Sequence, residues 1–170
     1  MRLVVVRHAI AEDRVTFAAS SRDDSTRPLT SQGRRKMERG ALGLKQLVPE
    51  VDLLATSPFK RALETAEIIA RAYGEPRVER LPELAPGAGV DRVVGWLNGQ
   101  RSRGTVAVVG HEPDLSQLVC AVLSGANGPF LELGKGGACL LEFAGPVGRG
   151  SATLDWLLGP KHLRRMSGRD

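Results

Sequence analysis

The apolar run Leu3-Val4-Val5-Val6 near the amino terminus constrains the fold more than any other stretch of the sequence. Three of its four residues are β-branched and none is polar, which is typical of a strand buried on both faces of a sheet. The run ends at Arg7 and His8. Because ligands of open α/β sheets bind just beyond the carboxyl ends of the strands, we expect these two side chains to lie at a functional edge.

The rest of the chain alternates between predicted strands and predicted helices. Apolar runs indicate further strands at residues 51–56, 77–81 and 105–109. Apolar residues spaced three and four apart indicate helices over residues 30–48, 57–73, 90–97 and 113–122. Residues 138–143 and 151–157 flank a glycine-rich turn, which favours an antiparallel pair of strands. This order predicts a single α/β domain, residues 1–170, in three layers (α/β/α) with a mainly parallel sheet and an antiparallel C-terminal pair.

Three segments carry no helix or strand pattern and are predicted to be irregular. They are a polar loop at residues 11–28, a glycine-rich loop at residues 125–137 and a basic tail at residues 160–170. Because of its length, the first loop is predicted to be functional or mobile rather than a tight turn. After the second strand, Ser57-Pro58 predicts a helix start, because a capping hydroxyl precedes a proline at the first helical position.

Composition narrows the classes of function. Aromatic residues make up only 4% of the chain, so the net charge of +5 is not accompanied by the rings that stack on nucleic-acid bases. No stretch approaches the roughly 20 apolar residues of a membrane helix. The early apolar run is too short for a secretion signal, which predicts a cytoplasmic protein without membrane or nucleic-acid partners. Cys120 and Cys139 lie among apolar residues and are predicted to be buried free thiols rather than a disulfide.

Basic and imidazole side chains follow three different predicted strands. Arg7 and His8 end the first strand, Arg61 lies one turn into the helix after the second, and His111 follows the fourth. Parallel strands bring their carboxyl ends to one edge, beside helix amino termini that attract anions. Guanidinium groups match phosphate oxygens in pairs, and a neutral histidine acts as a nucleophile near physiological pH. These residues therefore predict a phosphate pocket.

Each of these residues also has a plainer interpretation. The Arg7-His8 pair could be structural, Arg61 could be a solvated helix residue, and His111 could cap a turn. Their independent placement at three strand ends favours the pocket. No serine lies in a Gly-x-Ser-x-Gly turn and neither cysteine ends a strand, so a neutral His8 is the predicted nucleophile. A charged His111 is predicted to neutralise the oxyanions, and two distant histidines without ordered carboxylates predict neither a metal site nor a cofactor.

Four segments resemble signature sequences of the histidine phosphatase superfamily, which has the phosphoglycerate-mutase-like fold. They are Arg7-His8-Ala9, Arg27-Pro28-Leu29-Thr30-Ser31-Gln32-Gly33, Ser57-Pro58-Phe59-Lys60-Arg61-Ala62-Leu63-Glu64-Thr65-Ala66 and Val108-Val109-Gly110-His111. Alanine replaces the glycine of the usual Arg-His-Gly motif. Within the superfamily, the short chain, the Leu81-Pro82-Glu83-Leu84 segment and the ending from Trp156 to Pro160 are most similar to the SixA-type phosphohistidine phosphatases.

The resemblance implies a metal-independent phosphatase of signal transduction. His8 would carry the phosphoryl group, and Arg7, Arg61 and His111 would bind its oxygens. Glu83 matches the acidic residue that protonates the leaving group in larger members, although its sequence context departs from theirs. It is either this proton donor or a structural loop carboxylate.

The segments available to form the rim of the pocket, residues 11–28 and 82–90, are short. An open pocket favours a phosphohistidine on a protein, such as a phosphotransfer domain, as the substrate. A small phosphate ester is the alternative substrate. A catalytically silent module that binds phosphate or protein on the same fold is the alternative outside the enzymes. The presence of all four predicted pocket residues argues against this module.

Overall fold

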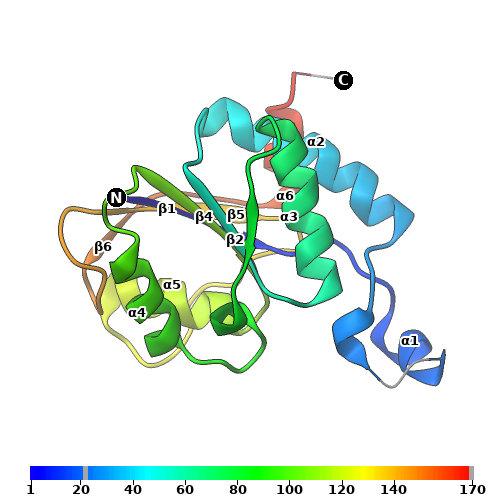
Figure 1. Ribbon diagram of the computed structural model, residues 1–170, viewed down its shortest axis with the longest axis horizontal. Helices are drawn as coiled ribbons and strands as arrows, with labels where there is room; N and C mark the ends of the chain where they lie inside the picture. Colours follow the sequence, from blue (N-terminus) through cyan, green and yellow to red (C-terminus); the bar gives the residue numbers. More distant parts are fainter. Residues whose placement is uncertain (21–22, 169–170) are drawn as a thin grey trace.

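A mixed six-stranded sheet forms the middle layer of the computed structural model, which describes residues 1–20 and 23–168 (Figure 1). Its strands, in chain order, are β1 (Arg2–Arg7), β2 (Leu53–Thr56), β3 (Val78–Arg80), β4 (Thr105–Gly110), β5 (Ala138–Phe143) and β6 (Ala152–Leu158). Across the sheet the order is β3-β2-β4-β1-β5-β6. The pairs β3–β2, β2–β4 and β4–β1 are parallel, whereas β5 is antiparallel to both β1 and β6. The predicted mainly parallel sheet with an antiparallel C-terminal pair is confirmed.

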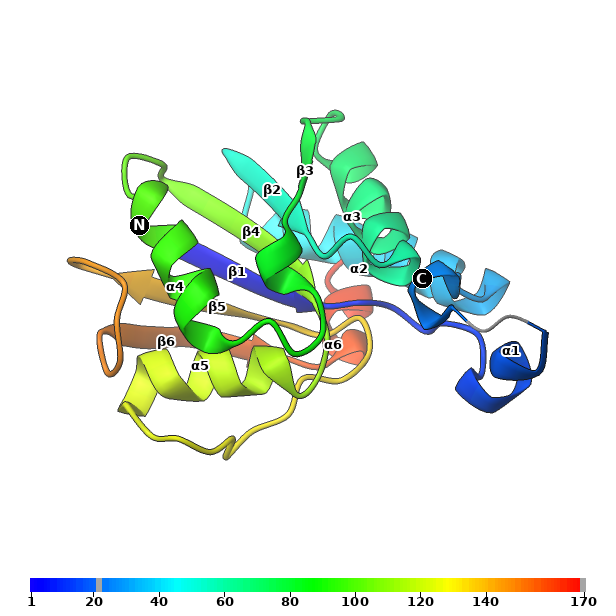
Figure 2. The same cartoon turned by 60° about the horizontal axis from the view of Figure 1, so that its bottom comes forward.

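Helices cover both faces of this sheet. The helices of the described residues are α1 (Arg14–Ser20), α2 (Ser31–Leu47), α3 (Lys60–Ala72), α4 (Val90–Gly99), α5 (Asp114–Ser124) and α6 (Pro160–Arg165), with the short 3₁₀ helices η1 (Asp24–Thr26) and η2 (Pro82–Leu84). α2, α3 and α6 lie against one face and α4 and α5 against the other, which confirms the three predicted layers (Figure 2). Within the described ranges, no helix is long and apolar enough to cross a membrane.

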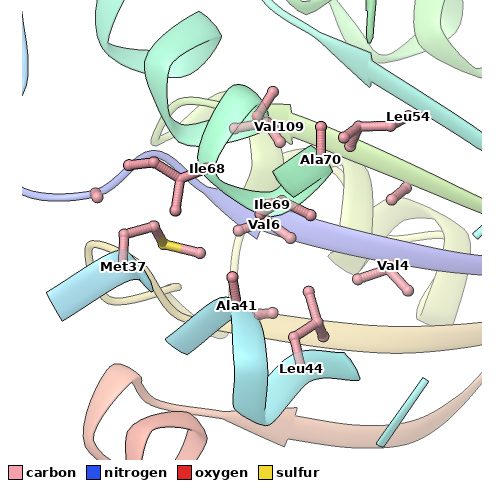
Figure 3. Close-up of a cluster of buried hydrophobic side chains, with 14 of the residues drawn as sticks. Val4, Val6, Met37, Ala41, Leu44, Leu54, Ile68, Ile69, Ala70 and Val109 are labelled. Atoms are coloured by element: carbon pink, nitrogen blue, oxygen red, sulfur yellow. The ribbon is translucent and has the colours of Figure 1, made fainter. Parts of the chain in front are cut away.

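β1 lies in the interior of the sheet, and its alternating side chains divide the core in two. Val4 and Val6 pack with side chains of α2 and α3, as Figure 3 shows. Leu3 and Val5 point to the opposite face and pack with residues of α4 and α5. All four side chains are fully buried, and burial of one such side chain contributes about 1.5–3 kcal/mol to stability. The end of this strand is therefore held from both faces, as the sequence predicts.

Two segments predicted to be irregular contain helices instead. α1 and η1 form within residues 11–28, and α6 forms within residues 160–170. α1 buries none of its residues and α6 buries only Leu163, so neither carries the apolar repeat by which a helix is recognised in a sequence. Residues 21, 22, 169 and 170 of these two segments lie outside the described part of the chain.

α3 begins later than the sequence predicts. Its first helical residue is Lys60, and Phe59 precedes it without a side-chain cap, so Ser57-Pro58 does not start the helix. Ser57 instead continues the extended chain after β2, where its N–H donates to the Val109 carbonyl at 2.9 Å. Pairing with β4 thus extends beyond the last residue of β2 and brings the Ser57 hydroxyl to the end of β4.

Gly33 near the start of α2 allows this helix to approach the chain just after His8. A Cβ at this position would collide with the carbonyl oxygen of Ile10, a backbone atom that cannot turn away. We expect Gly33→Ala to lower the free energy of unfolding by about 1–3 kcal/mol, because the loop after β1 must shift. Gly40→Ala, in the same helix and with open space around the new Cβ, should instead raise it by about 0.5–1 kcal/mol. Urea unfolding measures both changes, and equal stability of the two variants would contradict this packing.

Candidate active site

β1 ends beside the end of β4 (Figure 2). Its last residue, Arg7, pairs with Gly110 of β4, and His8 follows directly. The His8 N–H donates to the Gly110 carbonyl at 3.0 Å, and the Gly136 N–H donates to the carbonyls of Arg7 and His8 at 3.1 and 3.2 Å. Gly136 reaches this position with a φ of 77°, a left-handed conformation that favours glycine. Backbone hydrogen bonds from two neighbouring segments therefore fix the chain at His8.

The His8 ring has a defined tautomer. Its Nδ1 lies 2.7 Å from the Ala9 carbonyl oxygen, which only accepts hydrogen bonds, so Nδ1 carries the proton and donates. Nε2 then keeps its lone pair, and no described residue forms a hydrogen bond with it. A neutral ring with an unprotonated nitrogen is the form in which histidine acts as a nucleophile.

Burial and neighbouring cations keep both histidines of the site neutral. His8 is 7% exposed and His111 is 3% exposed. Burial above all, together with the charges of Arg61 and Arg7, lowers the pKa of His8 to about 4. Burial, followed by the charges of His8 and Arg61, lowers the pKa of His111 to about 3. His111 is therefore neutral at neutral pH in this structure, and the charged state predicted for it requires an anion alongside.

His111 lies directly after β4 and faces His8, with 5.1 Å between the ring centroids. Its Nε2 lies 2.8 Å from the Ser57 hydroxyl, and Phe59 packs against the ring in a T-shaped contact. Its Nδ1 is buried and has no hydrogen-bond partner among the described residues. Buried polar atoms are normally satisfied, so this nitrogen is a group that a bound ligand can satisfy.

Arg61 and Arg27 converge on the carboxylate of Asp24. Arg61 Nη1 lies 3.1 Å from Asp24 Oδ2 and also donates to the Asp24 carbonyl at 2.9 Å. Arg27 Nε donates to Asp24 Oδ1 at 2.7 Å, and its Nη1 donates to the Glu12 carbonyl at 2.7 Å. Burial opposes ionisation of Asp24, but the hydrogen bond from Arg27 and the two guanidinium charges outweigh it and lower the pKa of this carboxyl. The two arginines thus form a site that binds an anion.

Arg7 adds a third guanidinium group next to His8. Its Nη1 lies 3.0 Å from Glu132 Oε1 and donates to the Leu133 carbonyl at 2.5 Å. The Glu132 side chain is 75% exposed, so this ion pair contributes little. The Nε atoms of Arg7 and Arg61 are buried without a partner among the described residues. An oxyanion bound beside His8 could accept hydrogen bonds from these two unpartnered donors.

These groups line one cleft of about 730 Å³ at the carboxyl edge of the sheet. The structure brings together the four predicted pocket residues, Arg7, His8, Arg61 and His111. Residues between positions 11 and 27 form one wall, and Phe59, Pro86, Glu112 and Lys135 complete the lining. The segment predicted to be a short rim therefore contributes directly to the cleft.

Glu83 does not line this cleft. It belongs to η2, where its Oε1 lies 3.8 Å from Arg92 Nη2, and it borders a separate small hollow that His111 also borders. The carboxylates that do line the cleft are those of Glu12, Asp13, Asp24 and Glu112. A proton-donating function of Glu83 stays a prediction.

The sequence did not reveal four polar residues that shape the site. They are Asp24, Arg27, Ser57 and Thr65. Arg27, Ser57 and Thr65 lie inside the segments that resemble superfamily signatures, and this position could have indicated them. Asp24 lies outside those segments, and η1 alone brings its carboxylate to the arginines.

Thr65 ties the chain after His8 to the helix that carries Arg61. Its Oγ1 accepts from the Ala9 N–H at 3.0 Å and donates to the Arg61 carbonyl at 2.7 Å. We expect Thr65→Val to lower the free energy of unfolding by about 1–3 kcal/mol, because the buried Ala9 N–H loses its acceptor. Thr65→Ser keeps the hydroxyl and should lose less stability in urea unfolding. Equal losses in the two variants would speak against the importance of this hydrogen bond.

The two buried histidines also make stability depend on pH. An unfolded histidine has a pKa of about 6.5, whereas the pKa values of folded His8 and His111 are about 4 and about 3. Between these values the unfolded chain binds more protons, so the free energy of unfolding falls as the pH is lowered. From about pH 7.5 to about pH 5 we expect a loss of up to about 2 kcal/mol per histidine. His111→Gln should show a shallower dependence in urea unfolding, and an unchanged dependence would refute the lowered pKa.

The sequence profile of the histidine phosphatase superfamily (branch 1) matches residues 3–88, a range that contains both His8 and Arg61. The chain belongs to the histidine phosphatase superfamily. It is therefore a phosphatase, a hydrolase whose substrate carries a phosphoryl group.

Individual relatives of this histidine phosphatase agree with that membership. The phosphohistidine phosphatase SixA of Escherichia coli (strain K12) is 29% identical over 167 residues, which cover 96% of this chain and 97% of SixA. An uncharacterized protein of Picosynechococcus sp. is 35% identical over 139 residues, which cover 81% of this chain and 82% of that protein.

Solved structures confirm the phosphoglycerate-mutase-like fold of this histidine phosphatase. The structure of the protein histidine phosphatase SixA complexed with tungstate matches with a TM-score of 0.80 at 28% identity, over 96% of this chain and 99% of that chain. The alpha-ribazole phosphatase of Shigella flexneri shares the fold, with a TM-score of 0.73 at 18% identity over 94% of this chain and 97% of that chain. The chain is thus a SixA-like member of the superfamily.

Proposed function

We propose that this histidine phosphatase removes phosphoryl groups from phosphohistidine on a protein, through a phospho-His8 intermediate, within a single domain of residues 1–170. The geometry of the His8 ring is the main support for this proposal. Its Nδ1 is tied to the Ala9 carbonyl, so Nε2 keeps its lone pair in a cleft that Arg7, Arg61 and His111 also line. The similarity to SixA supports the choice of phosphohistidine.

In the first step, His8 Nε2 attacks phosphorus in line with the leaving group. The bond from this nitrogen to phosphorus forms as the bond from phosphorus to the substrate imidazole breaks. The substrate ring enters protonated on its other nitrogen, so it takes up the electron pair of the broken bond and leaves as neutral imidazole. Arg7, Arg61 and His111 bind the equatorial oxygens, which carry the negative charge. A protonated imidazole leaves readily, so this substrate depends less on a carboxylic acid such as Glu83 than an ester does.

In the second step, water attacks phospho-His8 and releases inorganic phosphate. The oxygen–phosphorus bond forms as the bond to Nε2 breaks, one proton of the water passes to a phosphoryl oxygen so that both protons stay on the released phosphate, and His8 returns to its neutral form. Throughout both steps Nδ1 donates to the Ala9 carbonyl, which stabilises the positive charge on the phosphorylated ring. The side chains of the cleft supply the stabilising charge, so neither step calls on a metal ion or a cofactor.

A protein substrate fits the segments around the cleft. α1 buries none of its residues, and η2 is a single short turn, so neither forms a deep cover over the site. A small phosphate ester is the second candidate, because a cleft of about 730 Å³ with a wall from residues 11–14, Asp24 and Arg27 can also enclose a small molecule.

Phosphate release from three donors tests the proposed function. The donors are a phosphorylated histidine phosphotransfer domain, free phosphohistidine and O-phosphoserine. We expect kcat/KM for the domain to exceed that for O-phosphoserine by at least about a hundredfold, because only a protonated imidazole leaves without further acid catalysis. A higher kcat/KM for O-phosphoserine would overturn the choice of substrate. Failure to release phosphate from any donor would overturn the catalytic mechanism itself.

A further inference from the structure

A second hollow, which we call the basic groove, adjoins the catalytic cleft between α2, the loop before β5 and α6. Its volume is about 170 Å³. The residues that characterise it are Lys36, Met37, Lys135, Pro160, Lys161 and Arg164. None of the described residues that line it is acidic or aromatic. The charged side chains of the basic groove are therefore all positive, and they surround a small apolar surface.

The cations of the basic groove are not neutralised within the described part of the chain. Lys36, Lys135 and Lys161 form no ion pair with a carboxylate of residues 1–20 or 23–168. Arg164 donates to the Pro160 carbonyl at 3.0 Å rather than to a carboxylate. The arginines of the catalytic cleft differ, because each of them binds a carboxylate. Like charges that share a hollow repel one another, and an acidic partner would remove this repulsion.

Lys135 joins the basic groove to the catalytic cleft, because this residue lines both. Ala9 and Gly136 also line the groove, and their backbone groups hold the ring and the main chain of His8. α2 and α6, which supply the remaining cations, pack side by side at this end of the molecule (Figure 1). A molecule seated in the groove therefore lies next to the residue proposed to accept the phosphoryl group.

We propose that the basic groove binds an acidic surface of the phosphorylated protein, beside its phosphohistidine; this inference rests on the proposed function. Lys36 is half-buried on α2, whereas Lys135 and Lys161 are exposed on two other segments. Lysines spread over three segments in this way suit an extended acidic surface, whereas small free anions are held by buried guanidinium forks and backbone N–H groups. The half-buried Pro160 adds apolar contact area that a free phosphate does not use. The lack of aromatic side chains in the described lining argues against single-stranded nucleic acid.

Two synthetic phosphohistidine peptides test the groove. In one, a run of glutamates follows the phosphohistidine, and in the other glutamines replace them. We expect the wild-type protein to hydrolyse the glutamate peptide with a kcat/KM about tenfold higher, through a lower KM. Lys36→Glu/Lys161→Glu should abolish this preference and leave hydrolysis of the glutamine peptide within about twofold of wild type, since neither lysine lines the cleft. Added salt should reduce the wild-type preference, because exposed charges are screened.

Arg101→Glu/Arg103→Glu is the matched control. It changes the net charge equally, at exposed positions before the start of β4 and therefore at the opposite edge of the sheet. The control should retain the preference for the glutamate peptide. A preference that survives in Lys36→Glu/Lys161→Glu, or disappears in the control as well, would overturn the groove as the docking site.

The remaining outcomes separate this inference from the function on which it rests. Equal hydrolysis of both peptides by the wild-type protein would overturn the groove alone. Hydrolysis of neither peptide would overturn the proposed function. Tighter binding of an oligothymidylate than of the glutamate peptide, lost in Lys36→Glu/Lys161→Glu, would assign the groove to nucleic acid and overturn the acidic protein surface.

Discussion

His8→Ala should abolish phosphate release from phosphohistidine and leave no phosphoryl group on the protein. We expect kcat to fall by at least about four orders of magnitude, because the substitution removes the nucleophile itself. The wild-type protein, quenched at alkaline pH during turnover, should carry an acid-labile phosphoryl group that intact mass spectrometry detects. The same quench of the variant should show the unmodified mass.

His162→Ala is the matched control for His8→Ala, because His162 is an exposed histidine on α6. It should keep both the phosphoryl label and the turnover of the wild-type protein. Thermal unfolding of each variant should be compared first, since His8 is buried and His162 is not. A label that persists in His8→Ala would mean that another residue carries the phosphoryl group.

Arg61→Ala should be nearly as damaging, with kcat/KM lowered by roughly three orders of magnitude. The substitution removes a guanidinium group from the cleft, on a residue that is only 5% exposed. It also leaves the Asp24 carboxylate with one fewer cation, so negative charge remains where the phosphoryl group is proposed to bind. Arg61→Lys keeps the charge but not the planar fork, and should recover only part of the loss.

Arg71→Ala is the control for Arg61→Ala, because Arg71 lies on the same helix and is exposed. Its kcat/KM should stay within about twofold of wild type, as expected for an exposed substitution away from the site. Steady-state kinetics with free phosphohistidine measures both variants. Indistinguishable kcat/KM values for the two would remove Arg61 from the catalytic site.

The strands and the long helices were predictable because their buried positions are occupied by apolar residues in regular patterns. β1 and β4 are apolar runs whose interior residues are fully buried, and α2 to α5 carry apolar repeats. Cys120 and Cys139 are buried free thiols, as their apolar neighbours predict. α1 and α6 bury one residue between them, so their sequences contain no apolar repeat from which a helix could be predicted. A helix that hardly contacts the core needs no such pattern of apolar residues.

The predicted part of the site follows from sheet topology. Arg7 ends β1, His8 and His111 directly follow β1 and β4, and Arg61 lies in the first turn of α3 after β2. Because β2, β4 and β1 are neighbours in the sheet, their carboxyl ends bring these residues to one cleft. Glu83 was chosen by its place in the sequence, but its carboxylate turns toward Arg92 on α4. Contacts of this kind depend on the path of an irregular segment, which no periodicity encodes.

Asp24 places a tethered carboxylate where Arg61 and Arg27 meet. A phosphoryl group that uses these guanidinium groups therefore enters by exchanging one anion for another. The same carboxylate would return when inorganic phosphate leaves, since its attachment to the chain gives it a high effective concentration. We therefore expect weak product inhibition, because free phosphate would compete with an anion that stays attached to the chain.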